Sequence, residues 1–384
     1  MQNLTVVIAG AGMGGLCAAI ALRQAGHQVH LYERATTLAP VGAAISIWPN
    51  GMKVLHALGV GAAAEAVAGD MRAMSYFSHT GGLLTRFSLA PLYQQVQQRA
   101  CPIARAALQQ LLLEAVGEEA VTLGVGCESY TETPEGVCVQ LSNGEAVTAD
   151  LLVAANGTHS TLRSAVAGEP IDRQYCGYVN WNGRIRMDAA LGDPYEWAQF
   201  VGEHKRVSLM PMGTDEFYFF FDVPLPAGTP NVREQYRAEL QKHFEGWAAP
   251  VQQLIEQLDP AAVARVEIHD TRRVPRLVTG RVTLLGDAAH AMTPNIGQGG
   301  CQAMEDAWVL ARCLERADTL NAGLNAYEHQ RADRVAGLVL KARERAAIIH
   351  GEDPVATQAW YEELPGSERD ILGGLIKTAQ GGPL

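Results

Sequence analysis

The run Gly10-Ala11-Gly12-Met13-Gly14-Gly15 is the first group of residues in this chain whose types and spacing could do chemistry. Glycines in this pattern allow a tight turn and let the backbone approach a pyrophosphate, while a helix that begins there presents free N–H donors. Glu33 follows at the distance expected for an acid that binds ribose hydroxyls, about 20 residues on. A glycine run alone would fit a plain tight turn. With the acid in place, the pattern predicts a dinucleotide site at Gly10, Gly12, Gly14, Gly15 and Glu33.

The elements that must position this loop are visible around it. Residues 4–9 form a short apolar, β-branched run, residues 16–25 are good helix formers, and residues 28–32 alternate in polarity. This order predicts a βαβ unit. The motif indicates a dinucleotide but does not distinguish FAD from NAD.

A second chemical signal lies near residue 286. The buried strand expected at residues 282–285 delivers Gly286 and Asp287, whose carboxylate can bind a ribityl hydroxyl of a flavin. The glycine-rich segment 297–300 then opens a helix, and donors at such a helix N-terminus stabilise negative charge on a reduced flavin ring. His290 on the same turn is interpreted as a structural histidine in preference to an acid or base.

Between these two motifs the residue composition of the sequence is different. Residues 175–187 and 206–223 are rich in aromatic and β-branched side chains and predict antiparallel sheet, and residues 233–258 predict one long helix. The chain after residue 298 reads as helices. The expected fold class is therefore α/β, with a discontinuous Rossmann-like FAD domain, an inserted mixed or antiparallel substrate sheet, and C-terminal helices.

The domain boundaries follow from these shifts in texture. The predicted FAD-binding domain comprises residues 1–72, 100–172 and 268–340, the predicted substrate domain comprises residues 73–99 and 173–267, and residues 341–384 form a C-terminal helical tail.

The glycine loop and Gly286-Asp287, at opposite ends of the chain, together resemble the single-component flavoprotein aromatic hydroxylases, which have the p-hydroxybenzoate hydroxylase-like (PHBH-like) fold. Arg105 matches the family arginine that reaches the ribityl and phosphate region of FAD. The family's Asp-Gly after the middle strand reads Asn156-Gly157 here, which loses the charge. By this resemblance the further cofactor-binding residues are Arg34, Ser46, Arg105, Cys127, Asp287, Gly297, Gln298, Gly299, Gly300 and Cys301.

Segments 41–51, 177–183, 200–211 and 217–228 are similar to the bacterial FAD-dependent urate hydroxylases of purine catabolism. The resemblance implies a cycle in which NADH or NADPH reduces FAD and O2 adds to the reduced flavin as a C4a-hydroperoxide. Urate would then be hydroxylated to 5-hydroxyisourate. No second glycine fingerprint is present, as expected when the nicotinamide donor visits transiently.

The same resemblance gives roles to four polar residues. Arg206 would donate to urate oxygens and Tyr218 would bond a carbonyl or ring nitrogen, so these two are the predicted catalytic residues. Asn180 and Asn295 complete the predicted substrate site. Each residue also has a structural reading: Arg206 as a salt-bridged residue, Tyr218 as a core aromatic and Asn180 as a turn residue. Asn295 replaces an aspartate of the urate enzymes, and an amide can orient a substrate but cannot act as a base.

Composition limits the partners. Lys and Arg number 30 against 41 Asp and Glu, a net charge of −11 without a long basic run, which argues against nucleic acid. Seven scattered cysteines without a CxxC pair argue against a disulfide framework, a zinc site and a flavin disulfide reductase. We expect no metal, no membrane segment and a cytoplasmic location, with a small aromatic anion as the partner.

Two alternatives remain open. The nearer one is a hydroxylase of another aromatic acid or N-heterocycle, which Asn156 and Asn295 favour. The more distant one is a nicotinamide-dependent dehydrogenase or a non-catalytic nucleotide-binding protein that uses only the first glycine loop.

Overall fold

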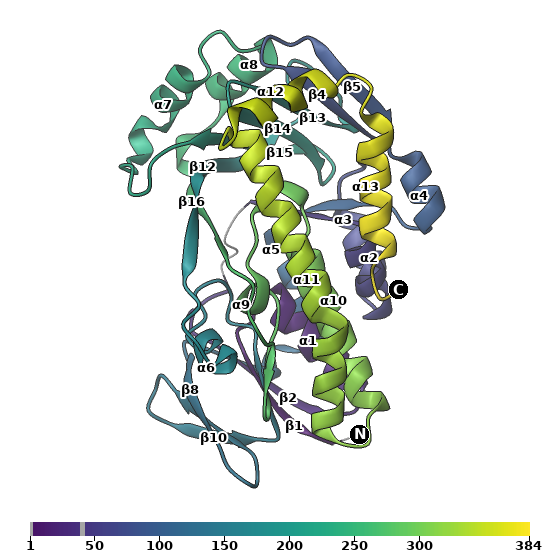
Figure 1. Ribbon diagram of the computed structural model, residues 1–384, viewed down its shortest axis with the longest axis vertical. Helices are drawn as coiled ribbons and strands as arrows, with labels where there is room; N and C mark the ends of the chain where they lie inside the picture. Colours follow the sequence, from purple (N-terminus) through teal and green to yellow (C-terminus); the bar gives the residue numbers. More distant parts are fainter. Residues whose placement is uncertain (1–2, 39–42) are drawn as a thin grey trace.

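A computed structural model describes residues 3–38 and 43–384. Its lower part in Figure 1 is built on a six-stranded sheet, in which every neighbouring pair is parallel except β17 and β18. The strands in spatial order are β17 (Val278–Thr279), β18 (Val282–Leu284), β11 (Leu151–Ala154), β1 (Thr5–Ala9), β2 (Gln28–Glu33) and β7 (Val121–Leu123). The predicted βαβ unit is present as β1, α1 (Met13–Gln24) and β2.

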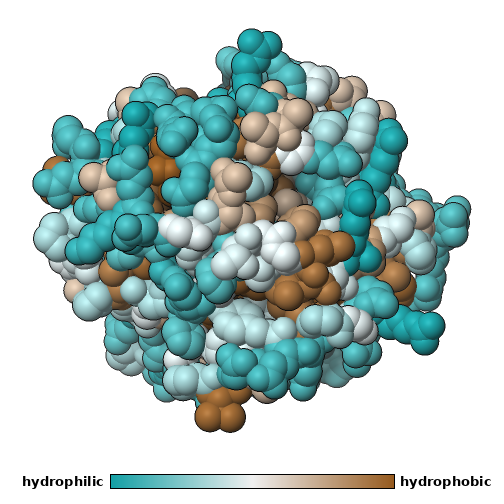
Figure 2. Space-filling view, turned by 90° about the horizontal axis from the view of Figure 1, so that it is seen from above, coloured by the Kyte–Doolittle hydropathy of each residue, from teal (hydrophilic) through white to brown (hydrophobic). Residues whose placement is uncertain are grey.

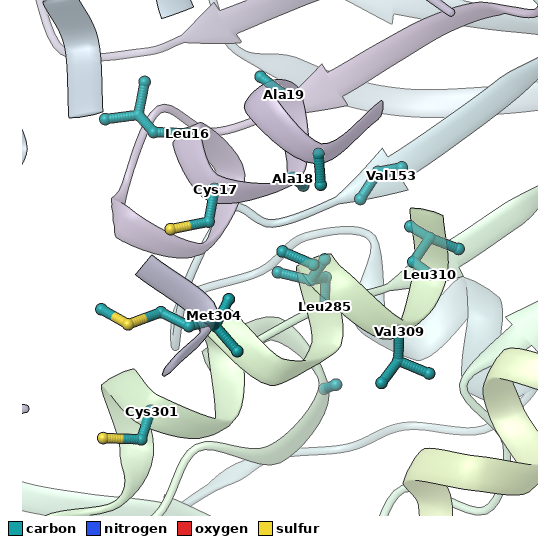
Figure 3. Packing of buried hydrophobic residues seen from close by; sticks show 14 of the residues in the cluster. Leu16, Cys17, Ala18, Ala19, Val153, Leu285, Cys301, Met304, Val309 and Leu310 are labelled. Carbon is teal, nitrogen blue, oxygen red and sulfur yellow. The ribbon is translucent and has the colours of Figure 1, made fainter. Parts of the chain in front are cut away.

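The helix α1 is held between this sheet and α10 (Gly299–Arg316), and Figure 3 shows their contact. Small side chains such as Ala18 let the two helices approach closely, and Met304 and Leu310 fill the space between them. A Cβ at Gly14 would lie 2.9 Å from Leu285 and 3.1 Å from Ala303. Glycine at this position therefore serves packing of the helix that carries the first loop onto the chain around the second.

The upper part is a seven-stranded mixed sheet, in which only β4 and β13 pair in parallel. The strands in spatial order are β16 (Ala264–Thr271), β12 (Arg173–Arg186), β15 (Glu216–Pro224), β14 (Lys205–Met212), β13 (Glu196–Gly202), β4 (Ala73–Ser78) and β5 (Leu83–Ser88). Trp181, Phe219 and Phe221 line one face and pack under α7 (Tyr236–His243) and α8 (Ala249–Gln257). The other face carries the polar side chains of Asn180, Asn182, Arg206 and Asp222 and is called the polar face below.

The prediction of a single long helix over residues 233–258 is wrong. The structure has a short 3-10 turn (Arg233–Gln235) and then the two helices α7 and α8, separated at residues 244–248. Gly246 adopts a φ of +75°, which a continuing helix does not allow, and Pro250 occupies the first turn of α8, where its missing N–H costs nothing. The break lets Phe244 and Trp247 turn into the core beneath the sheet.

The helix α11 (Leu320–His350) joins the two parts of the molecule, running from the six-stranded sheet up to the seven-stranded one (Figure 1). It continues past residue 340, where a domain boundary was expected; the boundaries themselves stay a prediction. The remaining helices are α2 (Pro49–Ala57), α3 (Gly61–Val67), α4 (Ala90–Val96), α5 (Arg105–Val116), α6 (Arg163–Ala167), α9 (Asp287–His290), α12 (Pro354–Glu363) and α13 (Glu368–Gln380). The small sheets are β8 (Cys127–Glu132), β9 (Val137–Leu141) and β10 (Ala146–Ala149), and β3 (Ala44–Ile47) with β6 (Cys101–Ala104).

Hydrophilic residues predominate on the face shown in Figure 2, and hydrophobic ones gather in small areas between them. Over the described ranges 3–38 and 43–384, none of the helices combines the length and the apolar character that crossing a bilayer requires.

Candidate functional site

The first glycine loop has the geometry that its sequence predicts. Gly10 adopts a φ of +102°, and a Cβ there would lie 2.6 Å from the carbonyl oxygen of Ala155. Gly15 packs against the carbonyl of Gly10 at the start of α1. Gly12, in contrast, has nothing within 4 Å of a Cβ position, so the loop presents bare backbone to open space at the N-terminus of α1.

That open space is a cavity of about 360 Å³. Glu33 lies in its wall, and its carboxylate accepts the N–H groups of Ala11 and Ala35, each at 2.9 Å. The side chain is thereby fixed at the end of β2 while lone pairs remain for a ribose. The lining residues are Ala9, Gly10, Gly12, Tyr32, Glu33, Arg34, Gly126, Cys127, Glu128, Ser142, Ala155, Asn156, Gly157, His159 and Thr161.

Asn156 supplies a test of whether a polar ligand fits this cavity. Its Oδ1 atom is buried and, among the described residues, has no hydrogen-bond partner. A buried acceptor without a partner is costly, and a ligand hydroxyl or a bound water would satisfy it. The cradle around Gly12, the fixed acid and this acceptor together suit the adenosine and pyrophosphate portion of FAD.

Arg163 of α6 fixes the loop that follows Asn156, a role that was not predicted from the sequence. Its guanidinium is almost fully buried and donates to the carbonyl oxygens of Thr158 at 3.0 Å, Asp287 at 2.9 Å and Ala288 at 2.7 Å. A fourth, longer contact reaches the carbonyl of Gly157. One side chain therefore ties the loop at residues 157–158 to the turn that carries Asp287.

The Gly286 turn is anchored from below by α10. The Gly286 N–H donates to Asp306 at 2.9 Å, and the same carboxylate pairs with His290 and Arg331, each at 2.6 Å. Burial of Asp306 works against its ionisation, but the charges of His290 and Arg331 outweigh it and hold the pKa of this carboxyl well below its usual range. His290 is thus committed to a structural pair, and Asp287 is left exposed at the start of α9.

The second glycine loop presents backbone and not side chains. Gln298 is buried and bonds to Asn50, and the Cys301 side chain packs in the core, where its sulfur accepts the backbone N–H of Trp48 at 3.3 Å. A Cβ at Gly297 would lie 2.6 Å from the indole nitrogen of Trp48 and 3.0 Å from the Ser46 hydroxyl. The predicted residues Ser46 and Gly297–Cys301 are therefore brought together at the start of α10, where an α-helix leaves its first backbone N–H groups without intrahelical partners.

Trp48 is a candidate that sequence reasoning missed. Its indole N–H is buried and has no partner among the described residues, and it lies beside Gly297. Arg105 begins α5 near this group and donates to the carbonyl of Ala44 at 3.3 Å.

Asn180, Arg206 and Tyr218, three of the four predicted substrate residues, lie on the polar face of the seven-stranded sheet. Strand register places Arg206 of β14 opposite Asp222 of β15, which in turn lies opposite Asn180 of β12. Arg206 donates twice to one oxygen of Asp222, at 2.6 and 2.9 Å, and Asn180 donates to the other at 2.7 Å. Asn180 also accepts from Asn182 at 2.8 Å, so its hydrogen bonds are made within the sheet.

Tyr218 lies on the same face, separated from Asp222 by Phe220, and the Arg206 guanidinium lies over the Phe220 ring at 4.8 Å. Burial, the largest cause, raises the pKa of Tyr218 to about 12, so the phenol stays protonated at neutral pH. Asn295, in a 3-10 turn (Pro294–Ile296), accepts from the Tyr178 hydroxyl at 2.6 Å. Its amide nitrogen is buried without a partner among the described residues, so it is a donor available to a ligand.

Three comparisons with known proteins agree with this geometry. A profile of the family described as "FAD binding domain" matches residues 3–342. The FAD-dependent urate hydroxylase of Klebsiella pneumoniae subsp. pneumoniae is 49% identical over 383 residues, 99% of this chain and 100% of that enzyme. An enzyme of the same name from Mycolicibacterium vanbaalenii is 46% identical, with 99% and 98% coverage.

Solved structures agree as well. The crystal structure of Klebsiella pneumoniae HpxO complexed with FAD and uric acid superposes with a TM-score of 0.96 at 48% identity, over 99% of this chain and 97% of that one. A salicylate hydroxylase substrate complex superposes with a TM-score of 0.78 at 24% identity, over 98% of both chains, and shows the shared fold alone.

The fold and the two glycine loops define an FAD-binding flavoprotein monooxygenase with the expected PHBH-like architecture. Within that class, the chain belongs to the family of the FAD-dependent urate hydroxylases. Over the described part of the chain, no group of three or more His, Cys, Asp or Glu side chains could hold a metal ion.

Proposed function

We propose that this protein hydroxylates urate to 5-hydroxyisourate in purine catabolism, using FAD, O2 and a reduced nicotinamide. In balance, urate, O2, NADH (or NADPH) and a proton give 5-hydroxyisourate, oxidised nicotinamide and water. The observation that carries the substrate proposal is the buried Arg206 on the polar sheet face, in a chain similar over its full length to named urate hydroxylases. Urate is a planar anion, and a fixed guanidinium opposite neutral donors suits it.

Residues at both glycine loops would hold the cofactor. Gly10, Gly12, Glu33, Arg34 and Cys127 line the cavity that would hold the adenosine and pyrophosphate. Gly14 and Gly15 would contribute through the close packing that shapes the loop. The backbone at Gly297–Cys301, with Ser46, Arg105 and Asp287, would hold the ring and ribityl end. When bound, FAD supplies the redox chemistry that activates O2, and the nicotinamide donor reduces it.

The polar sheet face would hold the substrate and orient it. Arg206 keeps Asp222 as its counter-ion, and within residues 3–38 and 43–384 its Nη1 makes only a long 3.5 Å contact to Gln199, so it can donate to a urate oxygen. Tyr218, protonated, can donate to a second carbonyl, and the unpaired amide nitrogen of Asn295 to a third. Asn180 holds Asp222 in place and contributes to substrate binding through it.

The test is coupled turnover. The purified protein, yellow with bound FAD, should oxidise NADH or NADPH faster when urate is added and consume urate and NADH in equal amounts. The Arg206→Ala variant should bind FAD normally yet lose the coupling between NADH oxidation and urate loss. Arg186→Ala is the matched control, since Arg186 is an exposed arginine of the same sheet paired with Asp215. Unchanged coupled turnover in Arg206→Ala would overturn the substrate site.

A second candidate substrate class is another aromatic acid or N-heterocycle. Asn295 favours it, because an amide at this place can orient a ring but cannot accept a proton as a carboxylate would. An aurachin C monooxygenase/isomerase from Stigmatella aurantiaca is 38% identical over 94% of this chain and 93% of that enzyme. A panel of aromatic acids and N-heterocycles in the NADH oxidation assay separates the two candidates, since the true substrate both stimulates oxidation and is consumed.

A cytoplasmic location is part of the proposal. All seven cysteines are free in the structure, which suits a reducing compartment.

A further inference from the structure

The last residue of α11, His350, lies beneath the predicted substrate anchor although it is 144 positions away in sequence (350 minus 206). Only 6% of its side chain is exposed, and its Nε2 atom is 4.0 Å from the Asp222 oxygen that Arg206 binds. The imidazole ring also stacks on the ring of Tyr178, with centroids 3.9 Å apart and planes tilted by 26°.

This stacking connects the two ends of the proposed urate site. The Tyr178 hydroxyl donates a hydrogen bond to Oδ1 of Asn295, so the position of the Tyr178 ring sets where the amide nitrogen of Asn295 points. His350 therefore stacks on Tyr178, which binds Asn295, and it also lies beside Asp222, which binds Arg206. No motif assigns it a function.

Its hydrogen bonds indicate which form of the imidazole the site accepts. Nδ1 is 3.3 Å from the carbonyl oxygen of His204 and can only donate to it, which leaves Nε2 of the neutral ring as a bare acceptor. Among the described residues, Nε2 has no partner, and it faces the acceptor oxygen of Asp222. A neutral His350 therefore leaves Asp222 entirely to Arg206 and Asn180.

The charged surroundings of His350 work in opposite directions. Asp222 on β15 favours the imidazolium and Arg206 on β14 opposes it, with His204 adding to the opposition from the 203–204 turn. Asp270 and Arg343 pair with each other across the neighbouring cleft, and Glu352 follows α11. Burial is the largest influence and lowers the pKa of His350 to about 4, so the ring is neutral at physiological pH.

We propose that His350 is a positioning residue for substrate binding, which acts as a neutral spacer that holds Tyr178 by stacking and keeps Asp222 committed to Arg206. This inference rests on the proposed function. A positive charge at this position would bring a donor to Asp222, draw the carboxylate away from Arg206 and disturb the anchor for the anionic substrate.

Three variants of His350 test separately the aromatic ring, the charge and the volume of its side chain. His350→Phe keeps a neutral stacking ring and should hold the KM for urate within about threefold of wild type. His350→Lys adds a cation beside Asp222 and should raise KM at least about tenfold and uncouple NADH oxidation, with FAD retained. His350→Ala removes the stacking and should fall between them. Direct urate binding by calorimetry should follow the same order as KM.

The pH profile gives a readout that does not depend on whether the lysine variant folds. Protonation of His350 should raise the wild-type KM for urate below pH 5 relative to that of His350→Phe, in which this limb is absent. Urate titrates equally in both assays, so the ratio of the two KM values isolates His350. Parallel profiles would overturn the inference, as would a lysine variant with wild-type KM and coupling. Failure of the wild-type enzyme itself to bind and consume urate would instead overturn the proposed function.

Discussion

Replacement of Arg163 by methionine should weaken FAD binding and the fold together. Its guanidinium, only 2% exposed, makes four contacts to backbone carbonyls, but three of them share Nη2. We therefore count about two independent charge-assisted bonds, each contributing about 1.5–3 kcal/mol, and allow for partial rehydration of the loop carbonyls. The expected loss is about 3–5 kcal/mol of unfolding free energy, a large part of the ~5–15 kcal/mol typical of a domain.

The same replacement should also weaken FAD binding. Without Arg163 the loop at residues 157–158 and the Asp287 turn are no longer tied, so the acceptor of Asn156 and the Asp287 carboxylate lose their fixed separation. We expect the FAD dissociation constant to rise at least about tenfold, equivalent to ~1.4 kcal/mol. Flavin fluorescence on release measures it, and urea unfolding of the FAD-free protein measures stability.

Arg272→Met is the matched control. Arg272 is an exposed arginine that also donates to one backbone carbonyl, that of Pro170, and pairs with Glu169. Its replacement should change stability by less than about 0.5 kcal/mol. If Arg163→Met bound FAD and unfolded like this control, the proposal that Arg163 ties the two halves of the cofactor site would be wrong.

Two further predictions concern titration and the Asn295 position. In the unfolded chain His350 should take up its proton near pH 6.5, but in the folded protein only near 4, so its contribution to stability is fully present above 6.5 and declines by up to about 3 kcal/mol as pH falls to 4. In urea unfolding, the stability of wild type relative to His350→Phe should fall by this amount over the same range. Asn295→Asp keeps the acceptor for Tyr178, adds a proton acceptor and removes the amide donor assigned to urate. The KM for urate should therefore rise, kcat should rise with it, and FAD binding should be unchanged; a kcat at or below that of wild type would show that a proton acceptor at this position does not assist the reaction.

Local patterns predicted the elements that hold the cofactor because those patterns are short in sequence. The glycine loop, the strand before it and Glu33 lie within 33 residues, and the structure places them as a βαβ unit. The mixed sheet was also predictable from its aromatic and β-branched texture. The break between α7 and α8 was not predicted, although Gly246 and Pro250 together are a sequence signal for it.

The polar face of the sheet was predicted only in part, for a geometric reason. Arg206 and Tyr218 were recognised by resemblance, but the partner of Arg206 depends on the register of three strands that are far apart in sequence. Asp222 lies in an aromatic run whose pattern says nothing of pairing. Asn180 donates to Asp222 and accepts from Asn182, contacts that the sequence did not indicate, and its contact with substrate stays a prediction.

The helix α11 links the turn at Gly286 to the Arg206–Asp222 pair, a connection between distant residues that no local sequence pattern shows. Arg331 of α11 forms an ion pair with Asp306, which accepts the Gly286 N–H. His350, the last residue of α11, lies 4.0 Å from Asp222. Nineteen residues separate them (350 minus 331), about 28 Å along a helix. A helix of that length sets the distance between the Gly286 turn and the Arg206–Asp222 pair. The relative placement of the proposed cofactor and substrate sites therefore depends on a helix whose residues Arg331 and His350 each make contacts that look structural when considered alone.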